Sequence, residues 1–216
     1  MKILKFTFFL FILTTRTSYS QIKEWNTYDF DSIVSVDMPF DVYEIDTIIN
    51  YKKIYELFSG NDSIRFNVKR MYLGKLYSNI ETLPLPYDTN GLKEFYSNFT
   101  QIFSEFLGLE LMSSNYIKYH HLVGNKYLFK NKNNQPIQEV NLVLVNKHLY
   151  SFTYTNINGL VKADKKLFFD AITFDENKDL RQFPVKSSAL KKVFFGIFIL
   201  LLLSFFLRFT TRKRNT

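Results

Sequence analysis

The sequence predicts an α+β domain, followed by one C-terminal transmembrane helix. Three observations lead to this class. Short runs within residues 32–71 and 115–155 place apolar residues at alternate positions, which is typical of β-strands. Residues 92–107 instead repeat their apolar residues with the helical period. Residues 193–207 contain no charge at all, which is typical of a membrane span.

The first strands lie between residues 24 and 71, and the opening one is the aromatic run at residues 24–31. Residues 32–39 form an alternating run that Pro39 ends, because proline has no backbone N–H to donate to a ladder. Residues 51–59 and 63–71 then flank a Gly60-Asn-Asp segment, and this arrangement predicts a β-hairpin.

A long amphipathic helix is predicted next, with Asn90 as its N-cap and Gly108 as its C-terminal stop. Its apolar stripe has two interpretations. The stripe either packs on a sheet, which we favour, or forms a hydrophobic ligand groove. The residues of the stripe are Leu92, Phe95, Tyr96, Phe99, Ile102, Phe103, Phe106 and Leu107.

Four further strands and a short helix complete the domain. The strands are predicted at residues 115–122, 126–131, 139–145 and 148–155, with turns at Gly124-Asn125 and Asn146-Lys147. The helix is predicted within residues 160–172, where apolar residues again recur at the helical period. A polar linker is predicted at residues 176–188.

Residues 1–20 have the pattern of a secretory signal peptide. Lys2 and Lys5 precede a short apolar core at residues 6–13, and Ser18-Tyr-Ser20 offers the small residues expected before a cleavage point. Cleavage there leaves Gln21 first. We therefore expect residues 21–175 to form an extracytoplasmic domain, either periplasmic or extracellular.

The predicted membrane span covers residues 189–208. Its uncharged stretch reaches about 22 Å as a helix, which is short of a hydrocarbon core of about 30 Å. Thirteen of the fifteen residues 193–207 are Val, Ile, Leu or Phe, however, and long basic side chains at the flanks can reach outward. A single-pass protein with a basic cytoplasmic tail, residues 209–216, follows from this pattern. The membrane-anchor flanks are Lys191, Lys192, Arg208, Arg212, Lys213 and Arg214.

The formal charge of +8 belongs to the two ends of the chain. Nine of the 28 Lys and Arg residues lie in residues 1–20 and 191–216, which leaves 19 against all 20 acidic residues elsewhere. A neutral domain does not favour nucleic-acid binding. The sequence has no cysteine, which excludes disulfides and thiolate chemistry.

The order of elements resembles the PsbP-like family of small exported α+β domains. The resemblance covers about residues 24–175 and is carried by Tyr28-Asp-Phe30, Val36-Asp-Met-Pro39 and Phe168-Phe-Asp-Ala-Ile-Thr-Phe174. It implies an antiparallel β-sheet flanked by helices, an αβα sandwich, with a binding or assembly role and no catalytic motif. The C-terminal span departs from the family pattern.

The three histidines are the main candidates for metal binding or catalysis. His120 and His121 are adjacent and would point to opposite faces of a strand, so they cannot readily hold one ion together. One of them could still pair with His148 across the sheet, although surface or half-buried histidines are favoured. We predict no catalytic, cofactor-binding or metal site.

Acidic residues near the start of the domain and several tyrosines have competing interpretations. The acids lack the spacing of a calcium loop, so a solvated strand face is favoured. The tyrosines form either a binding surface or sheet packing. The acids are Asp29, Asp31, Asp37, Asp41, Glu44 and Asp46, and the tyrosines are Tyr43, Tyr51, Tyr55, Tyr72 and Tyr77.

These observations predict a membrane-anchored, exported, non-enzymatic module that binds or assembles an envelope protein. Two alternatives remain. The C-terminal hydrophobic segment and basic tail could be a sorting signal that is removed on maturation. A hydrolase that uses one of the histidines with a nearby acid is the other alternative.

Overall fold

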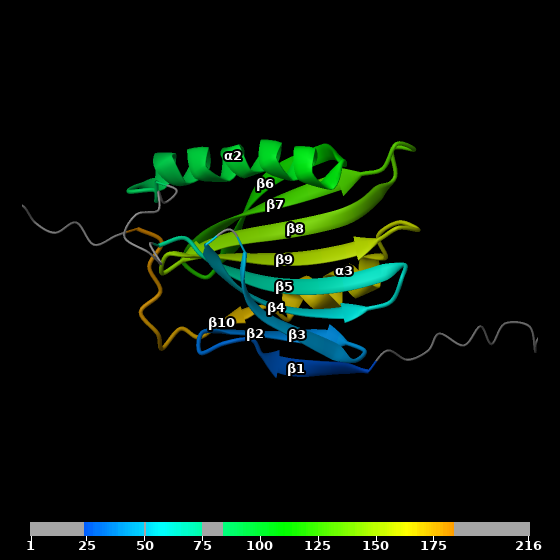
Figure 1. The fold of residues 1–216 in the computed structure, drawn as a ribbon, viewed down its shortest axis with the longest axis horizontal. Coiled ribbons are helices and arrows are strands. Elements are labelled where there is room, and N and C mark those ends of the chain that lie inside the picture. The colour runs from blue at the N-terminus through cyan, green and yellow to red at the C-terminus, as the bar shows by residue number, and fades with distance from the viewer. Residues whose placement is uncertain (1–23, 50, 75–83, 184–216) are drawn as a thin grey trace, which may run out of the picture. The chain divides into compact units, whose positions relative to one another are not determined.

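The computed structural model describes residues 24–49, 51–74 and 84–183, with side chains omitted for residues 101–107. Two β-sheets and two helices make up this part of the chain (Figure 1). The strands are β1 (Trp25–Asp29), β2 (Val34–Pro39), β3 (Val42–Ile49), β4 (Lys52–Gly60), β5 (Ile64–Tyr72), β6 (Glu110–Tyr119), β7 (Leu122–Lys130), β8 (Pro136–Val145), β9 (His148–Asn156) and β10 (Thr173–Phe174). The helices are α2 (Thr89–Leu107) and α3 (Lys162–Asp170).

The larger sheet has seven strands in the order β3-β4-β5-β9-β8-β7-β6, and every neighbouring pair is antiparallel. Two β-meanders, β3–β4–β5 and β6–β7–β8–β9, therefore meet where β5 pairs with β9. That pairing joins residues far apart in the sequence, with Ile64 opposite Asn156 and Tyr72 opposite His148.

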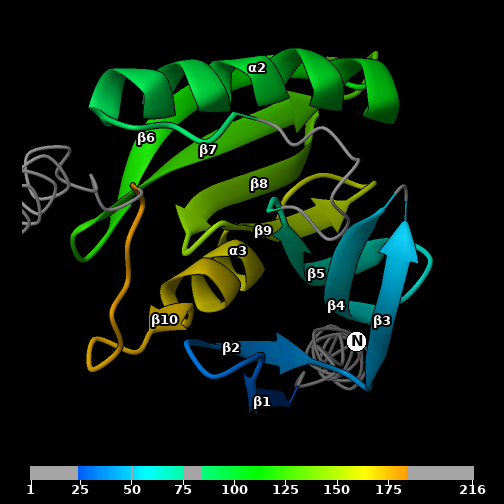
Figure 2. The ribbon, with the colours of Figure 1, turned by 60° about the vertical axis from the view of Figure 1, so that its left-hand side comes forward.

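The smaller sheet covers one face of the larger one. Its order is β1-β2-β10, and α3 contacts both β2 and β9, as Figure 2 shows. The core between the two sheets is rich in aromatic side chains, for example Phe66, whose ring stacks on Tyr154 at 4.8 Å between centroids. On the side of β2 and α3, this core is closed by three fully buried residues, Val36, Met38 and Phe168.

Helix α2 covers part of the opposite face. Leu92, Phe95, Tyr96 and Phe99 are buried, as the predicted stripe requires, and they pack over β7 and β8. The hydroxyl of Tyr96 donates to the carbonyl of Val123 at 2.8 Å and accepts from the amide of Leu144 at 3.0 Å. The helix begins at Thr89 with Asp88 capping it, so the predicted N-cap Asn90 is wrong, while it ends before Gly108 as predicted.

The predicted fold class is wrong. Strand residues far outnumber helix residues in the described part of the chain, and a second sheet lies where the αβα sandwich places a helical layer. This second sheet consists of β1 and β2, which pair over five residues, and of β10, a strand of two residues that pairs with Val34 and Ser35.

Within the described residues, no helix has both the length and the apolar character needed to cross a membrane. The C-terminal transmembrane helix of the predicted class therefore has no counterpart there, and residues 189–208 lie outside the described part of the chain, as do the signal peptide 1–20 and the tail 209–216.

The turn predicted at Gly124-Asn125 is also misplaced. The chain reverses at His120-His121, where His120 has a φ of 53°, and Gly124 lies inside β7. A Cβ on Gly124 would come within 2.7 Å of the carbonyl oxygen of Leu142 on β8. This glycine therefore serves the close approach of two strands.

Candidate functional site

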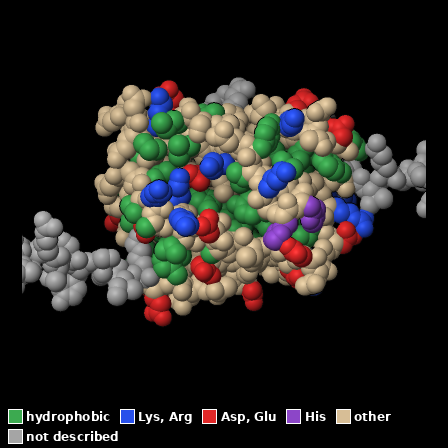
Figure 3. All heavy atoms as spheres, turned by 180° about the vertical axis from the view of Figure 1, so that it is seen from behind, with side chains coloured by type: hydrophobic (Ala, Val, Ile, Leu, Met, Phe, Trp, Pro, Cys, Tyr) green, Lys and Arg blue, Asp and Glu red, His purple; other side chains and the backbone are tan. Residues whose placement is uncertain are grey.

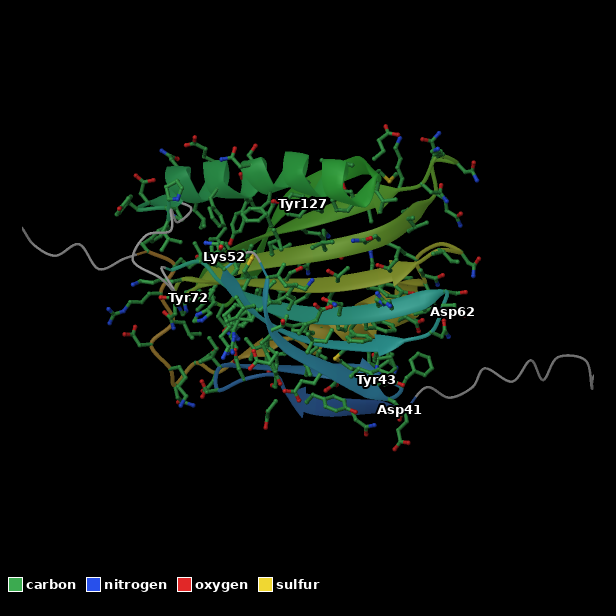
Figure 4. The ribbon with its side chains drawn as sticks, in the orientation of Figure 1. Asp41, Tyr43, Lys52, Asp62, Tyr72 and Tyr127 are labelled. Carbon is green, nitrogen blue, oxygen red and sulfur yellow. The ribbon has the colours of Figure 1, made fainter. Side chains whose placement is uncertain are left out.

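An open groove runs over the part of the seven-stranded sheet that α2 leaves uncovered. It has a volume of about 1090 Å³ and is lined by residues of β3, β4, β5, β8 and β9, with Phe99 of α2 beside them. Figure 4 labels Tyr43 on β3, Lys52 at the start of β4 and Asp62 at the β4–β5 turn, which mark its extent along the β3–β5 strands.

Strand alternation explains why the groove lies on this face. In β9, Leu149 faces the core beneath α2, so Ser151 and Thr153 point the same way, while Tyr150 and Phe152 face the other sheet. The buried residues of the helix pack on β7 and β8, and in Figure 1 its ribbon lies beside β6 and β7, on the far side of β8 from β9.

The centre of the groove floor is polar and balanced in charge. The carboxylate of Glu56 accepts one hydrogen bond from the side-chain amide of Asn67 and lies 3.1 Å from Nζ of Lys69. Ser151 and Thr153 place their hydroxyl oxygens 3.4 Å apart on the neighbouring strand. Together these side chains have no net charge, and they can form hydrogen bonds to a ligand.

The walls of the groove are apolar. Phe99, Leu142 and Leu149 lie on the α2 side. On the β3 side, the ring of Tyr43 stacks on Phe58 with centroids 5.4 Å apart. A polar floor between apolar walls suits an elongated ligand that has one polar and one apolar side.

A smaller pocket of about 230 Å³ lies on the other face of β4, β5 and β9. Its lining residues are Lys53, Tyr55, Arg70, Tyr72 and His148. The rings of Tyr72 and His148 lie 5.1 Å apart. Burial, together with the positive charge of Arg70, lowers the pKa of His148, so its imidazole is neutral at neutral pH.

The charges of this pocket are already matched by acids. Arg70 is paired with Asp31 at 2.7 Å, and Lys53 lies 3.5 Å from Asp46. An anionic ligand would therefore have to displace an existing carboxylate. For this reason the larger groove is the stronger candidate.

The three histidines have separate partners. His120 contacts the carboxylate of Glu176, Nε2 of His121 lies 3.1 Å from the carbonyl oxygen of Leu180, and Nδ1 of His148 lies 3.1 Å from that of Asn146. In residues 24–49, 51–74 and 84–183, no three His, Cys, Asp or Glu side chains are grouped so that they could hold a metal ion.

The acidic residues near the start of the domain also have local roles. Asp31 accepts from the backbone amides of Ile33 and Val34 at 2.9 Å each, which fixes the β1–β2 turn. Asp37 accepts from Thr27 at 2.6 Å. These contacts are structural.

The tyrosines proposed as a binding surface divide between two sites. Tyr43 lines the groove, while Tyr55 and Tyr72 line the smaller pocket. Tyr51 is exposed between β3 and β4. Tyr77 lies outside the described residues, and so do the membrane-anchor flanks Lys191, Lys192, Arg208, Arg212, Lys213 and Arg214.

On the side opposite the view of Figure 1, acidic and basic side chains are interspersed with hydrophobic ones (Figure 3). A nucleic-acid surface instead collects Lys and Arg on one face. The arrangement on this side therefore offers no support for phosphate-backbone binding.

The floor of the groove was not identified from the sequence, although a signal for it exists. Arg65, Asn67 and Lys69 alternate with buried Phe66 and Val68 along β5, and Ser151, Thr153 and Thr155 do the same along β9. Both patterns indicate a polar face without showing that the two faces adjoin.

The chain matches no protein-family model, no curated protein and no solved structure. The chemistry of the groove must therefore indicate what it holds.

Proposed function

We propose that this chain is a non-enzymatic binding module, exported to the cell envelope and held at a membrane by its C-terminal hydrophobic segment. In this proposal its groove takes an elongated, amphipathic segment of an envelope protein. The observation that supports the proposal is the groove of about 1090 Å³ on the uncovered face of the seven-stranded sheet.

The size and lining of the groove favour binding of a long ligand. Pockets for small ligands generally hold about 300 to 1,000 Å³, so this one lies at or above the upper end of that range. Its lining extends from Tyr43 and Ile49 on β3 to Phe99 on α2. A protein segment can place apolar side chains against both walls and its polar groups against the floor.

The centre of the polar floor favours hydrogen bonding over ionic attraction, while Lys52, Asp62 and Arg65 lie toward the ends of the groove. Glu56 and Lys69 neutralise each other, and Ser151 and Thr153 are uncharged. A ligand recognised here therefore needs donors and acceptors along one side. The backbone of a protein segment supplies both.

The proposed location comes from the ends of the chain. The signal pattern of residues 1–20 and the apolar stretch 193–207 indicate export and membrane attachment. Both predictions fall outside the described residues.

Filling the groove is the direct test of the function. Thr153 lies on the floor, and Thr153→Trp would place a large ring there. We expect affinity capture from detergent-solubilised membranes to recover a partner with the wild-type chain. The amount recovered with the variant should be about tenfold lower.

Asn26→Trp is the control, because Asn26 is an exposed strand residue outside the groove. This variant should recover the partner as the wild type does. Thermal unfolding of both variants should follow that of the wild type. Equal recovery by Thr153→Trp and the wild type would contradict the proposal.

A further inference from the structure

Strand β3 forms one edge of the seven-stranded sheet. It pairs with β4 over all eight residues from Val42 to Ile49, without a shift in register. Among the strands that the structure describes, none pairs with its outer side. Within the described residues, the backbone N–H and C=O groups on that side therefore have no ladder partner, as at the edge of any sheet.

This edge also exposes apolar side chains. Tyr43, Ile45, Ile48 and Ile49 are between 41% and 58% exposed. Sheet edges are commonly protected by bulges, lysines or prolines. The opposite edge, β6, has such a bulge between Leu111 and Ser113, whereas β3 is regular.

The two faces of β3 have different chemistry. Tyr43 and Ile49 line the groove, and alternation places Ile45 on the same side. Glu44 and Asp46 lie on the other face, with Ile48 at its end, and all three are exposed. A strand added beside β3 would therefore meet apolar residues on the groove side, and two carboxylates followed by Ile48 on the other side.

Charge decides against a second copy of the same strand. Antiparallel self-pairing that keeps each face intact can centre on Ile45, which places Glu44 opposite Asp46 twice. It can also centre on Asp46, which places that residue opposite its own copy. Like charges directly opposite each other are destabilising. Centring on Thr47 avoids this, but it sets Asp46 opposite Ile48 and leaves only residues 45–49 paired.

We propose that β3 accepts an extended segment of a partner protein in which apolar and basic residues alternate, as an added strand of the sheet. The apolar residues would extend the β3 wall of the groove, and the basic residues would face Glu44 and Asp46. Main-chain hydrogen bonds would supply affinity and the alternate side chains specificity. The inference rests on the proposed function, because β3 is a wall of the proposed groove.

A short synthetic peptide in which isoleucine and lysine alternate is the probe. With the full chain in mild detergent, we expect fluorescence anisotropy to show binding about tenfold tighter than for the peptide in which isoleucine and glutamate alternate. The chain carries a formal charge of +8, so general attraction would favour the glutamate peptide instead. Methylation of alternate peptide nitrogens should weaken binding about tenfold, because it removes the donors of the ladder.

Charge reversal on the strand should reverse the preference. Glu44→Lys with Asp46→Lys should bind the glutamate peptide about tenfold better than the lysine peptide. Glu94→Lys with Glu110→Lys, two exposed acids on α2 and β6, is the control that should keep the wild-type preference. Gain of binding to the glutamate peptide also shows that the reversed variant is folded.

Several outcomes would overturn the inference. They are equal binding of both peptides, an unchanged preference after charge reversal, and a dimer through β3 in sedimentation experiments. Thr153→Trp separates this inference from the proposed function, since it fills the floor and should leave peptide binding at the β3 edge in place. If the peptide fails to bind while capture of the partner still depends on Thr153, only the edge-strand inference falls.

Discussion

Nη1 of Arg70 on β5 donates a hydrogen bond to Oδ2 of Asp31, in the turn between β1 and β2, at 2.7 Å. The hydroxyl of Tyr150 on β9 donates to the same oxygen at 2.8 Å. The other carboxylate oxygen accepts from the amides of Ile33 and Val34. One carboxylate therefore joins the smaller sheet to two central strands of the larger sheet.

Replacement of Asp31 should be strongly destabilising. The side chain of Asp31 is only 8% exposed, and Asp31→Ala would leave Arg70 and Tyr150 without their acceptor. We expect the free energy of unfolding to fall by about 3 kcal/mol, as for other broken buried pairs. Urea unfolding of the two proteins measures the difference.

Asp46→Ala provides the comparison for this prediction. Asp46 pairs with Lys53 at 3.5 Å, and both side chains are about half exposed. An exposed pair contributes about 1 kcal/mol or less. A loss for Asp31→Ala no larger than that for Asp46→Ala would show that the carboxylate does not join the sheets.

Two glycines with positive φ should respond differently to alanine. Gly60, at the end of β4, has a φ of 134°, and a Cβ there would lie 2.0 Å from the carbonyl oxygen of Ile64. Gly108 follows α2 with a φ of 62° and has no atom within 4 Å of the added Cβ. Gly60→Ala should therefore cost about 3 kcal/mol or more, and Gly108→Ala about 1 kcal/mol.

Thermal and urea unfolding of the two alanine variants test this difference directly. Both substitutions add the same methyl group at a positive φ, but only Gly60 combines a φ that alanine rarely adopts with a steric contact at Ile64. Similar losses for the two variants would mean that the β4–β5 turn adjusts its backbone freely.

The elements predicted correctly from the sequence are those held by local patterns. The β4–β5 hairpin follows from alternation around Gly60, and α2 from its apolar stripe. The β8–β9 turn follows from Asn146-Lys147, both of which have positive φ. In each case the residues that define the element are neighbours in the chain.

The elements that were missed depend on distant partners. Strand β10 has two residues and exists through its pairing with Val34 and Ser35. Strand β3 buries little and is defined by its ladder with β4. The groove depends on which strands α2 covers and on its position beside the polar faces of β5 and β9. A pattern within one strand does not contain that information.

The processing of the chain is a separate prediction. The signal pattern predicts that the mature protein begins at Gln21, and the anchor hypothesis predicts that residues 209–216 are retained. Intact mass spectrometry of the protein purified from membranes measures both ends. A mass without the C-terminal segment would favour the sorting-signal alternative, and Ser20→Arg should block the cleavage before Gln21.

Buried tyrosines should make the fold sensitive to alkali. Burial raises the pKa of Tyr119 and of Tyr127 from 10.0 to about 12, and burial with the charge of Asp31 raises the pKa of Tyr150. Above pH 10 the unfolded chain loses these protons while the folded chain keeps them. Stability is therefore complete below pH 10 and is lost as the pH rises to about 12.

Tyr119→Phe should make this alkaline loss shallower. A phenol whose pKa rises from 10.0 to about 12 accounts for roughly 2 to 3 kcal/mol of the loss. The variant also removes the acceptor of the Asn141 side-chain amide, 2.9 Å away, so we expect it to be about 1 kcal/mol less stable at neutral pH. Urea unfolding across the alkaline range measures both effects, and exposed Tyr87→Phe should follow the wild-type curve. If Tyr119→Phe and the wild type lose stability in parallel above pH 10, the phenol of Tyr119 is not protected in the folded state.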